Sequence, residues 1–141
     1  MASIQPGGDT TRSGSGVLMA AFGPAPYFAQ AVLAAASIKQ FHPEIQIATA
    51  TDQSGHPLLQ SSLFDLRIAI DLSGAPRLPH DFAAPLLGRV AALRLSPFDK
   101  ALAFDVDARL RAPRLEQLFA LLDQIEIAQA PCNADTSTEY Q

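Results

Sequence analysis

The sequence predicts an α/β fold, with a Rossmann-like, mostly parallel sheet covered by helices on both faces. Short continuous apolar runs recur along the chain, each about as long as a buried strand. Segments in which apolar residues recur with helical spacing lie between these runs. Strands that alternate with helices form β-α-β units with right-handed crossovers, which bring the carboxyl ends of the strands to one edge of the sheet. We therefore expect ligands to bind at that edge.

The first predicted unit follows residues 1–15, which are rich in Gly, Ser and Thr and are expected to form a flexible lead-in. Residues 16–22 are a continuous apolar run closed by a Gly-Pro pair, and they predict a central strand. Residues 27–40 carry apolar side chains nearly all round, which indicates a well-covered helix. Pro26 suits the first turn of this helix, and Pro43 ends it.

The middle of the chain continues the alternation. Residues 45–50 alternate in polarity and predict a second strand, and a short helix is expected over residues 57–63. Residues 66–72 predict a third strand, which leads into a loop rich in Gly, Pro and Ser. Asp81 can cap a helix over residues 82–95.

The last predicted elements are a strand, a helix and a strand. Residues 100–105 form a short apolar run bounded by charge, which suits a buried fourth strand. Residues 114–123 place Leu and Phe on one face and predict a helix that opens after a proline. Residues 125–130 predict a fifth strand.

The composition fits one α/β domain over residues 16–131, followed by a polar tail at 132–141. The chain has 141 residues, of which 48% are hydrophobic and 17% charged, so it can bury a core. The net charge of −4 argues against a generic nucleic-acid binder, because phosphate backbones require clustered Lys and Arg. A single cysteine, Cys132, fits a reducing compartment. The longest apolar stretch, 29–36, is too short to span a bilayer, and we expect a soluble, cytoplasmic protein.

Asp105 and Asp107 are the strongest candidates for a ligand site. They follow an apolar run at positions i and i+2, and would point the same way if the strand continued through both. Two carboxylates at one strand end repel unless a positive charge lies between them. A divalent cation that prefers oxygen, Mn²⁺ or Mg²⁺, would supply this charge and keep positions open for phosphate oxygens. The alternative is that the two carboxylates merely cap a loop.

Other polar residues give weaker signals. The turn at residues 22–26 has one Gly and two Pro, so it cannot wrap a diphosphate with a row of backbone N–H groups, and a metal would be the main counter-charge. His42, His56 and His80 lack metal-ligand spacing and are expected on the surface or in loops. Lys100 lies at the opposite end of its predicted strand from the aspartates, and we expect it to be structural.

Several segments occur in an order that is typical of one family. Residues 16–23 read Gly-Val-Leu-Met-Ala-Ala-Phe-Gly, and Thr51-Asp52 follows the second predicted strand. Residues 89–107 contain a Ser-Pro-Phe-Asp-Lys turn, a strand and Asp-Val-Asp in succession, and a Leu-rich helix follows. Over residues 16–131 the chain resembles the N-terminal, donor-binding part of a nucleotide-diphospho-sugar transferase of the GT-A glycosyltransferase fold.

The resemblance implies a metal-dependent nucleotide-sugar site. Asp105 and Asp107 would bind the nucleotide sugar through Mn²⁺ (or Mg²⁺), with Asp107 the more direct metal ligand. Val106, between them, would belong to the same binding motif. The residue after the pair is commonly a small polar one in such families, whereas here it is Ala108.

The resemblance also implies contacts to the rest of the nucleotide. Ala21 and Phe22, at the end of the first predicted strand, would lie against the nucleobase. Tyr27 matches an aromatic residue that could stack on the base, although a core Tyr is equally compatible with its position. Arg89 stands where such families often have a basic residue near the phosphates, and a solvated helix residue is the alternative.

The resemblance leaves three interpretations open. In the first, the chain is a glycosyltransferase-like protein that binds a nucleotide sugar, with a UDP-sugar favoured. Transfer to an unknown acceptor would then need an acceptor-binding C-terminal half, which the resemblance implies is missing here. In the second, it is a non-catalytic nucleotide-binding fragment that could form a homo-oligomer to cover its missing half. In the third, it is a haloacid-dehalogenase-like phosphatase with Asp105 as the nucleophile.

Overall fold

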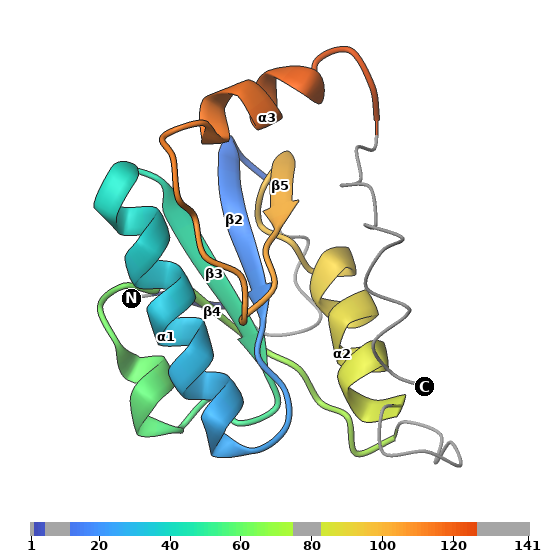
Figure 1. Ribbon diagram of the computed structural model, residues 1–141. Helices are drawn as coiled ribbons and strands as arrows, with labels where there is room; N and C mark the ends of the chain where they lie inside the picture. The colour runs from blue at the N-terminus through green and yellow to red at the C-terminus, as the bar shows by residue number, and fades with distance from the viewer. Residues whose placement is uncertain (1, 5–11, 75–82, 127–141) are drawn as a thin grey trace, which may run out of the picture.

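A parallel sheet forms the centre of the computed structural model, which describes residues 2–4, 12–74 and 83–126 (Figure 1). The sheet has five strands in the order β1-β4-β3-β2-β5, and every neighbouring pair runs parallel. The α/β fold predicted from the sequence is therefore confirmed. The strands are β1 (Ala2–Ile4), β2 (Ser15–Ala20), β3 (Gln46–Thr51), β4 (Leu66–Ala69) and β5 (Lys100–Ala103).

Helices lie on both faces of this sheet. In Figure 1, α1 lies to the left of β2, α2 lies to its right, and α3 lies across the ends where β2 and β5 begin. The helical segments are α1 (Ala25–Phe41), the 3-10 helix η1 (Pro57–Gln60), α2 (Ala83–Arg94) and α3 (Leu115–Leu121). Helix α1 begins after Pro24, which sits at its N-cap in an extended conformation.

The residues of β2 divide between two hydrophobic clusters. Val17 and Met19 pack with α1 and α3, where Phe28 and Phe119 are buried. Leu18 belongs to the cluster on the other face, which includes Ala92 of α2. This alternation is the period-2 pattern of a strand covered on both faces, and it explains why residues 16–22 are apolar without interruption.

The strand order creates one topological switch point. From β2 the chain moves to β3 and β4 on one side, and then α2 carries it back to β5 on the other side of β2. The chain therefore leaves β2 through α1 on one face of the sheet and enters β5 from α2 on the other face. Crevices at such points are where parallel α/β sheets bind ligands.

Three differences from the predicted elements affect the interpretation. Strand β1 pairs with β4, in register from Ala2 with Leu66 to Ile4 with Ile68, so the expectation of a flexible lead-in over residues 1–15 is wrong at residues 2–4. The strand predicted at 125–130 is not present at residues 125 and 126, and its remaining residues, like the tail at 132–141, lie outside the described residues. His42 lies in the loop after α1, as the expectation of a surface or loop position allows, but it is buried, with 4% of its surface exposed.

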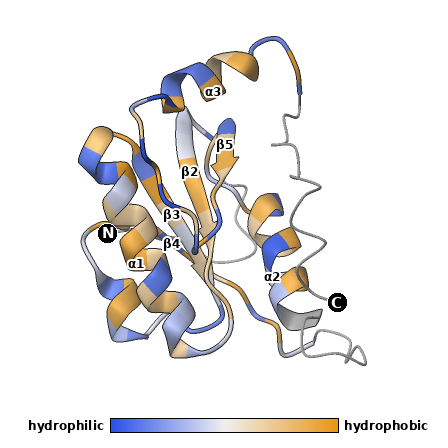
Figure 2. Ribbon diagram, in the orientation of Figure 1, coloured by the Kyte–Doolittle hydropathy of each residue, from blue (hydrophilic) through white to orange (hydrophobic). Residues whose placement is uncertain are grey.

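The most consequential difference concerns β5. This strand ends at Ala103, and Asp105 opens a tight turn in which the Ala108 N–H donates to the Asp105 carbonyl oxygen at 3.0 Å. Strand geometry therefore does not continue through Asp105 and Asp107, and the expectation that alternation places both on one face is wrong. Figure 2 shows the change from the hydrophobic residues of β5 to the hydrophilic segment that follows.

Candidate functional site

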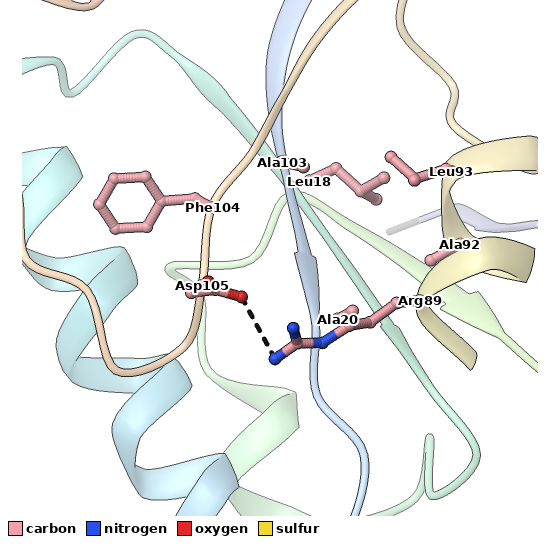
Figure 3. A pocket seen from close by; sticks show the side chains of 8 residues that line it. All are labelled: Leu18, Ala20, Arg89, Ala92, Leu93, Ala103, Phe104 and Asp105. Atoms are coloured by element: carbon pink, nitrogen blue, oxygen red, sulfur yellow. Dashed lines mark ion pairs between the residues drawn. The ribbon is translucent and has the colours of Figure 1, made fainter. Parts of the chain in front are cut away.

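A hollow lies between β2, β5 and α2, directly at the switch point of the sheet (Figure 3). Its volume is about 200 Å³. Small side chains of the two strands leave this space open, and α2 closes it from one side. Its lining residues are Leu18, Ala20, Arg89, Ala92, Leu93, Ala103, Phe104 and Asp105. Figure 3 shows Phe104 pointing away from Arg89, toward α1, whereas Asp105 points toward Arg89.

A larger hollow adjoins the first and shares Ala20 and Arg89 with it. Its volume is about 540 Å³, which falls within the range of about 300–1,000 Å³ typical of small-molecule sites. Most of its surface is apolar, and aromatic residues stand at the end of β2 and the start of α1. The lining residues are Ala20, Phe22, Gly23, Pro24, Tyr27, Pro85, Leu86, Arg89 and Val106.

Arg89 and Asp105 form an ion pair at the boundary between the two hollows. Arg89 Nη2 lies 3.2 Å from Asp105 Oδ1, and 52% and 64% of the two side chains remain exposed. Among the described residues, Asp105 Oδ2 accepts no side-chain hydrogen bond, and most of the Asp105 side chain is exposed. Asp105 therefore already has a positive partner supplied by the protein.

A second basic group, Arg109, which the sequence reasoning did not single out, holds the aspartate turn in place. Arg109 donates through Nη1 to the carbonyl oxygens of Val106 at 3.0 Å and Ala108 at 2.6 Å. Its Nη2 donates to the side chain of Gln30 in α1. The guanidinium thus fastens the turn at residues 105–108 to α1. The sequence signal was only an Arg two residues after the Asp pair, which does not reveal where its side chain folds.

The structure brings together five of the residues predicted for the site. These five line one or both hollows: Phe22, Tyr27, Arg89, Asp105 and Val106. Phe22 and Val106 are nearly buried, with 6% and 5% of their surfaces exposed, whereas Tyr27 is 49% exposed.

Two of the predicted residues lie elsewhere. Ala21 is fully buried in the core on the α1 face, and its N–H donates to the Ala50 carbonyl oxygen at 2.8 Å. It continues the sheet toward β3 and does not line either hollow. Asp107 is exposed at the tip of the turn and lines neither of the two hollows described above. Lys100, at the start of β5, pairs with Asp123 far from the aspartate turn, as predicted.

Gly88 determines how closely α2 approaches the site. A Cβ atom at this position would lie 2.7–2.8 Å from the ring of Phe22. Only a residue without a side chain therefore allows α2 to pack against the end of β2 as it does. The missing side chain in mid-helix costs helix stability but brings Arg89 to the carboxyl edge of the sheet.

Comparisons with known proteins bear on the fold. No family model and no curated protein matches the sequence. Among solved structures, TarS of S. aureus, a glycosyltransferase, matches with a TM-score of 0.50 and 15% sequence identity. The match covers 79% of this chain and 20% of that chain.

This chain has a glycosyltransferase-like fold. The identity is too low to show more than the fold, and the chain spans only 20% of the length of the solved chain that it matches. Within the described part of the chain, no helix has the length and apolar character needed to cross a bilayer.

Proposed function

We propose that the protein binds a nucleotide-diphosphate sugar, with Asp105 and Asp107 holding Mn²⁺ or Mg²⁺ against the diphosphate. The position of the Asp-x-Asp turn carries this proposal. The turn directly follows β5 at the switch point of the sheet, beside a hollow of about 540 Å³ that Phe22 and Tyr27 line. Ligands of parallel α/β sheets bind at this point. The glycosyltransferase-like fold supports a sugar-nucleotide as the ligand.

The donor set suits the proposed cation. Asp105 and Asp107 are both exposed carboxylates, and carboxylate oxygens are the ligands that Mn²⁺ and Mg²⁺ prefer. The ion pair with Arg89 engages Oδ1 of Asp105 and leaves Oδ2 for another ligand. When bound, such a cation would neutralise charge on a departing diphosphate, which is a Lewis-acid role.

The surrounding residues would bind the remainder of the donor. Arg89 presents its guanidinium where the two hollows meet, and this planar group can donate two parallel hydrogen bonds to a phosphate. Tyr27, which is 49% exposed, offers an aromatic face on which a base can stack. Phe22 would form the apolar floor of the base site.

UDP is the proposed nucleotide, and the proposed reaction is transfer of the sugar to an acceptor. A cytoplasmic location and self-association remain predictions from the sequence.

Calorimetry tests the proposal. The protein would be titrated with UDP, GDP and UDP-glucose, with Mn²⁺ or with a chelator. We expect at least one nucleotide to bind only in the presence of Mn²⁺, and its affinity to fall at least about tenfold in Asp107→Asn and Asp105→Asn, because each loses a charged ligand. Glu126→Gln, an exposed carboxylate outside the site, is the matched control.

Two results would count against the proposal. If the nucleotide affinity is equal in the aspartate variants and the control, Asp105 and Asp107 do not take part in nucleotide binding. A covalent aspartyl-phosphate on Asp105, trapped with a phosphate mimic, would favour the phosphatase interpretation instead. Binding without donor hydrolysis or transfer would support a non-catalytic nucleotide-binding protein.

A further inference from the structure

Three metal-ligating side chains meet at the edge of the sheet opposite to the aspartate turn. They are His42, which follows the last residue of α1, Glu44 in the loop before β3, and Glu116 in the first turn of α3. One ligand atom from each lies within 4.8 Å of the other two. Figure 1 shows the end of α1 and the start of α3 at the edge where β2 and β5 begin, whereas the aspartate turn follows the end of β5.

His42 is the unusual member of this group. Its side chain is only 5% exposed, and its Nδ1 lies 3.6 Å from Glu44 Oε1, beyond hydrogen-bond distance. Nε2 is buried and has no hydrogen-bond partner among the described residues. Buried polar groups are almost always hydrogen-bonded, so a buried imidazole whose ring makes no hydrogen bond calls for a separate explanation.

The two glutamates carry like charges that lie close together. Glu44 and Glu116 are exposed, carry the same charge and approach each other within 4.8 Å. Among the described residues, Glu44 has only the imidazole of His42 beside it, at 3.6 Å, and Glu116 makes no ion pair. The nearby Lys39 is engaged by Asp65 and by the carbonyl oxygens of Pro43 and Ile45. A cation among the three side chains would neutralise the like-charge contact and give a ligand bond to His42 Nδ1, the ring nitrogen that faces Glu44.

We propose that His42, Glu44 and Glu116 form a Zn²⁺ site that joins the carboxyl end of α1 to α3. One imidazole nitrogen and two carboxylates favour Zn²⁺ over Mg²⁺ or Ca²⁺, which prefer oxygen ligands alone. In a tetrahedral zinc site the ligand atoms lie about 3.3 Å apart, given bonds of about 2.0–2.1 Å. His42 Nδ1 and Glu44 Oε1 lie 3.6 Å apart, and all three ligand atoms lie within 4.8 Å of one another. A change of rotamer in the two exposed glutamates can shorten these distances.

The proposed role of this site is structural. Helix α3 is seven residues long and is held by the burial of Leu115 and Phe119. A helix of this length is marginal by itself, so an additional link at its first turn would stabilise it. The ion would bind the folded state through residues separated by more than 70 positions in sequence, and would therefore raise the stability of the whole domain.

Metal titration with matched variants tests the proposal. The chelator-treated protein would be titrated with Zn²⁺ by calorimetry and by thermal unfolding, and with Co²⁺, whose visible absorption reports the donor set. We expect Zn²⁺ to raise the unfolding temperature, and the affinity to fall at least about tenfold in Glu44→Gln and in Glu116→Gln. Both side chains are exposed, so neither substitution should prevent folding. Glu126→Gln should bind Zn²⁺ as the unchanged protein does.

Zn²⁺ binding at this site must also be distinguished from metal binding at the aspartate turn. Asp107→Asn should leave Zn²⁺ affinity unchanged, and Glu116→Gln should leave Mn²⁺-dependent nucleotide binding unchanged. Zn²⁺ binding that is equal in the Glu44, Glu116 and Glu126 variants, or that is lost in Asp107→Asn, would overturn the proposal. An unfolding temperature that does not respond to Zn²⁺ would overturn it as well.

Discussion

Arg89 of α2 and Asp105, two residues beyond β5, form an ion pair across the switch point of the sheet, with 3.2 Å between Nη2 and Oδ1. More than half of each side chain is exposed, so the pair contributes only about 0–1 kcal/mol to the free energy of unfolding. Its position is more informative than its strength, because it places a guanidinium and a carboxylate at the junction of two hollows.

Arg89→Ala should therefore separate stability from ligand binding. We expect the free energy of unfolding to change by less than about 1 kcal/mol. The affinity for UDP with Mn²⁺ should fall about tenfold, which is the cost of losing about one charge-assisted hydrogen bond to phosphate. Urea unfolding and calorimetry measure the two quantities. Arg94→Ala, on the same helix and exposed, is the control, and equal affinities in the two variants would contradict the role given to Arg89.

The guanidinium of Arg109 should control the order of the aspartate turn. Arg109→Ala removes the donors to the Val106 and Ala108 carbonyl oxygens and to Gln30, and we expect a loss of about 1–3 kcal/mol in the free energy of unfolding. Amide hydrogen exchange should report faster exchange at Ala108, whose N–H closes the turn.

Arg111→Ala provides the comparison for this experiment, because Arg111 is exposed and lies two residues farther along the chain. If exchange at Ala108 is as slow in Arg109→Ala as in Arg111→Ala, the turn does not depend on the hydrogen bonds that Arg109 donates.

Gly88→Ala should destabilise the protein, although alanine is the better helix former. The added Cβ would lie 2.7–2.8 Å from the Phe22 ring, and such overpacking costs about 1–3 kcal/mol. The gain in helix propensity is only about 1 kcal/mol. Urea unfolding of Gly88→Ala beside Gly55→Ala, where an added Cβ meets nothing within 4 Å, would measure the net effect. A more stable Gly88→Ala would mean that Phe22 moves aside without cost.

Much of the fold follows from local sequence. The apolar run at 16–22 and the helix at 27–40 were predicted because a central strand and a well-covered helix both lack a polar face. Strand β1 could not be found in this way, because three residues carry no periodic pattern and are stabilised by pairing with β4. The strand predicted at 100–105 was too long, because charged residues after an apolar run do not show where pairing stops.

In the candidate site, too, some residues were predicted from the sequence and others depend on the three-dimensional packing. Asp105 and Arg89 were predicted from position and resemblance, and the structure brings them into contact. Ala21 was misplaced because the end of an apolar run does not show which of its residues face the core. The meeting of His42 with Glu116 could not be predicted from spacing, because it depends on how α1 and α3 come together in three dimensions.

Asp65→Asn tests the link between the end of α1 and the start of β3. One oxygen, Asp65 Oδ2, accepts hydrogen bonds from Lys39 Nζ at 2.9 Å and from the Ile47 N–H at 2.8 Å. An amide oxygen carries no full charge, so it leaves the lysine without its counter-ion and weakens both hydrogen bonds, and we expect a loss of about 1–3 kcal/mol in the free energy of unfolding. The Lys39 side chain is only 17% exposed, so the loss should change little between low and moderate salt. Urea unfolding at two salt concentrations measures this, with the exposed Asp52→Asn as control; a loss that disappears in salt would reduce the contact to an ordinary surface ion pair.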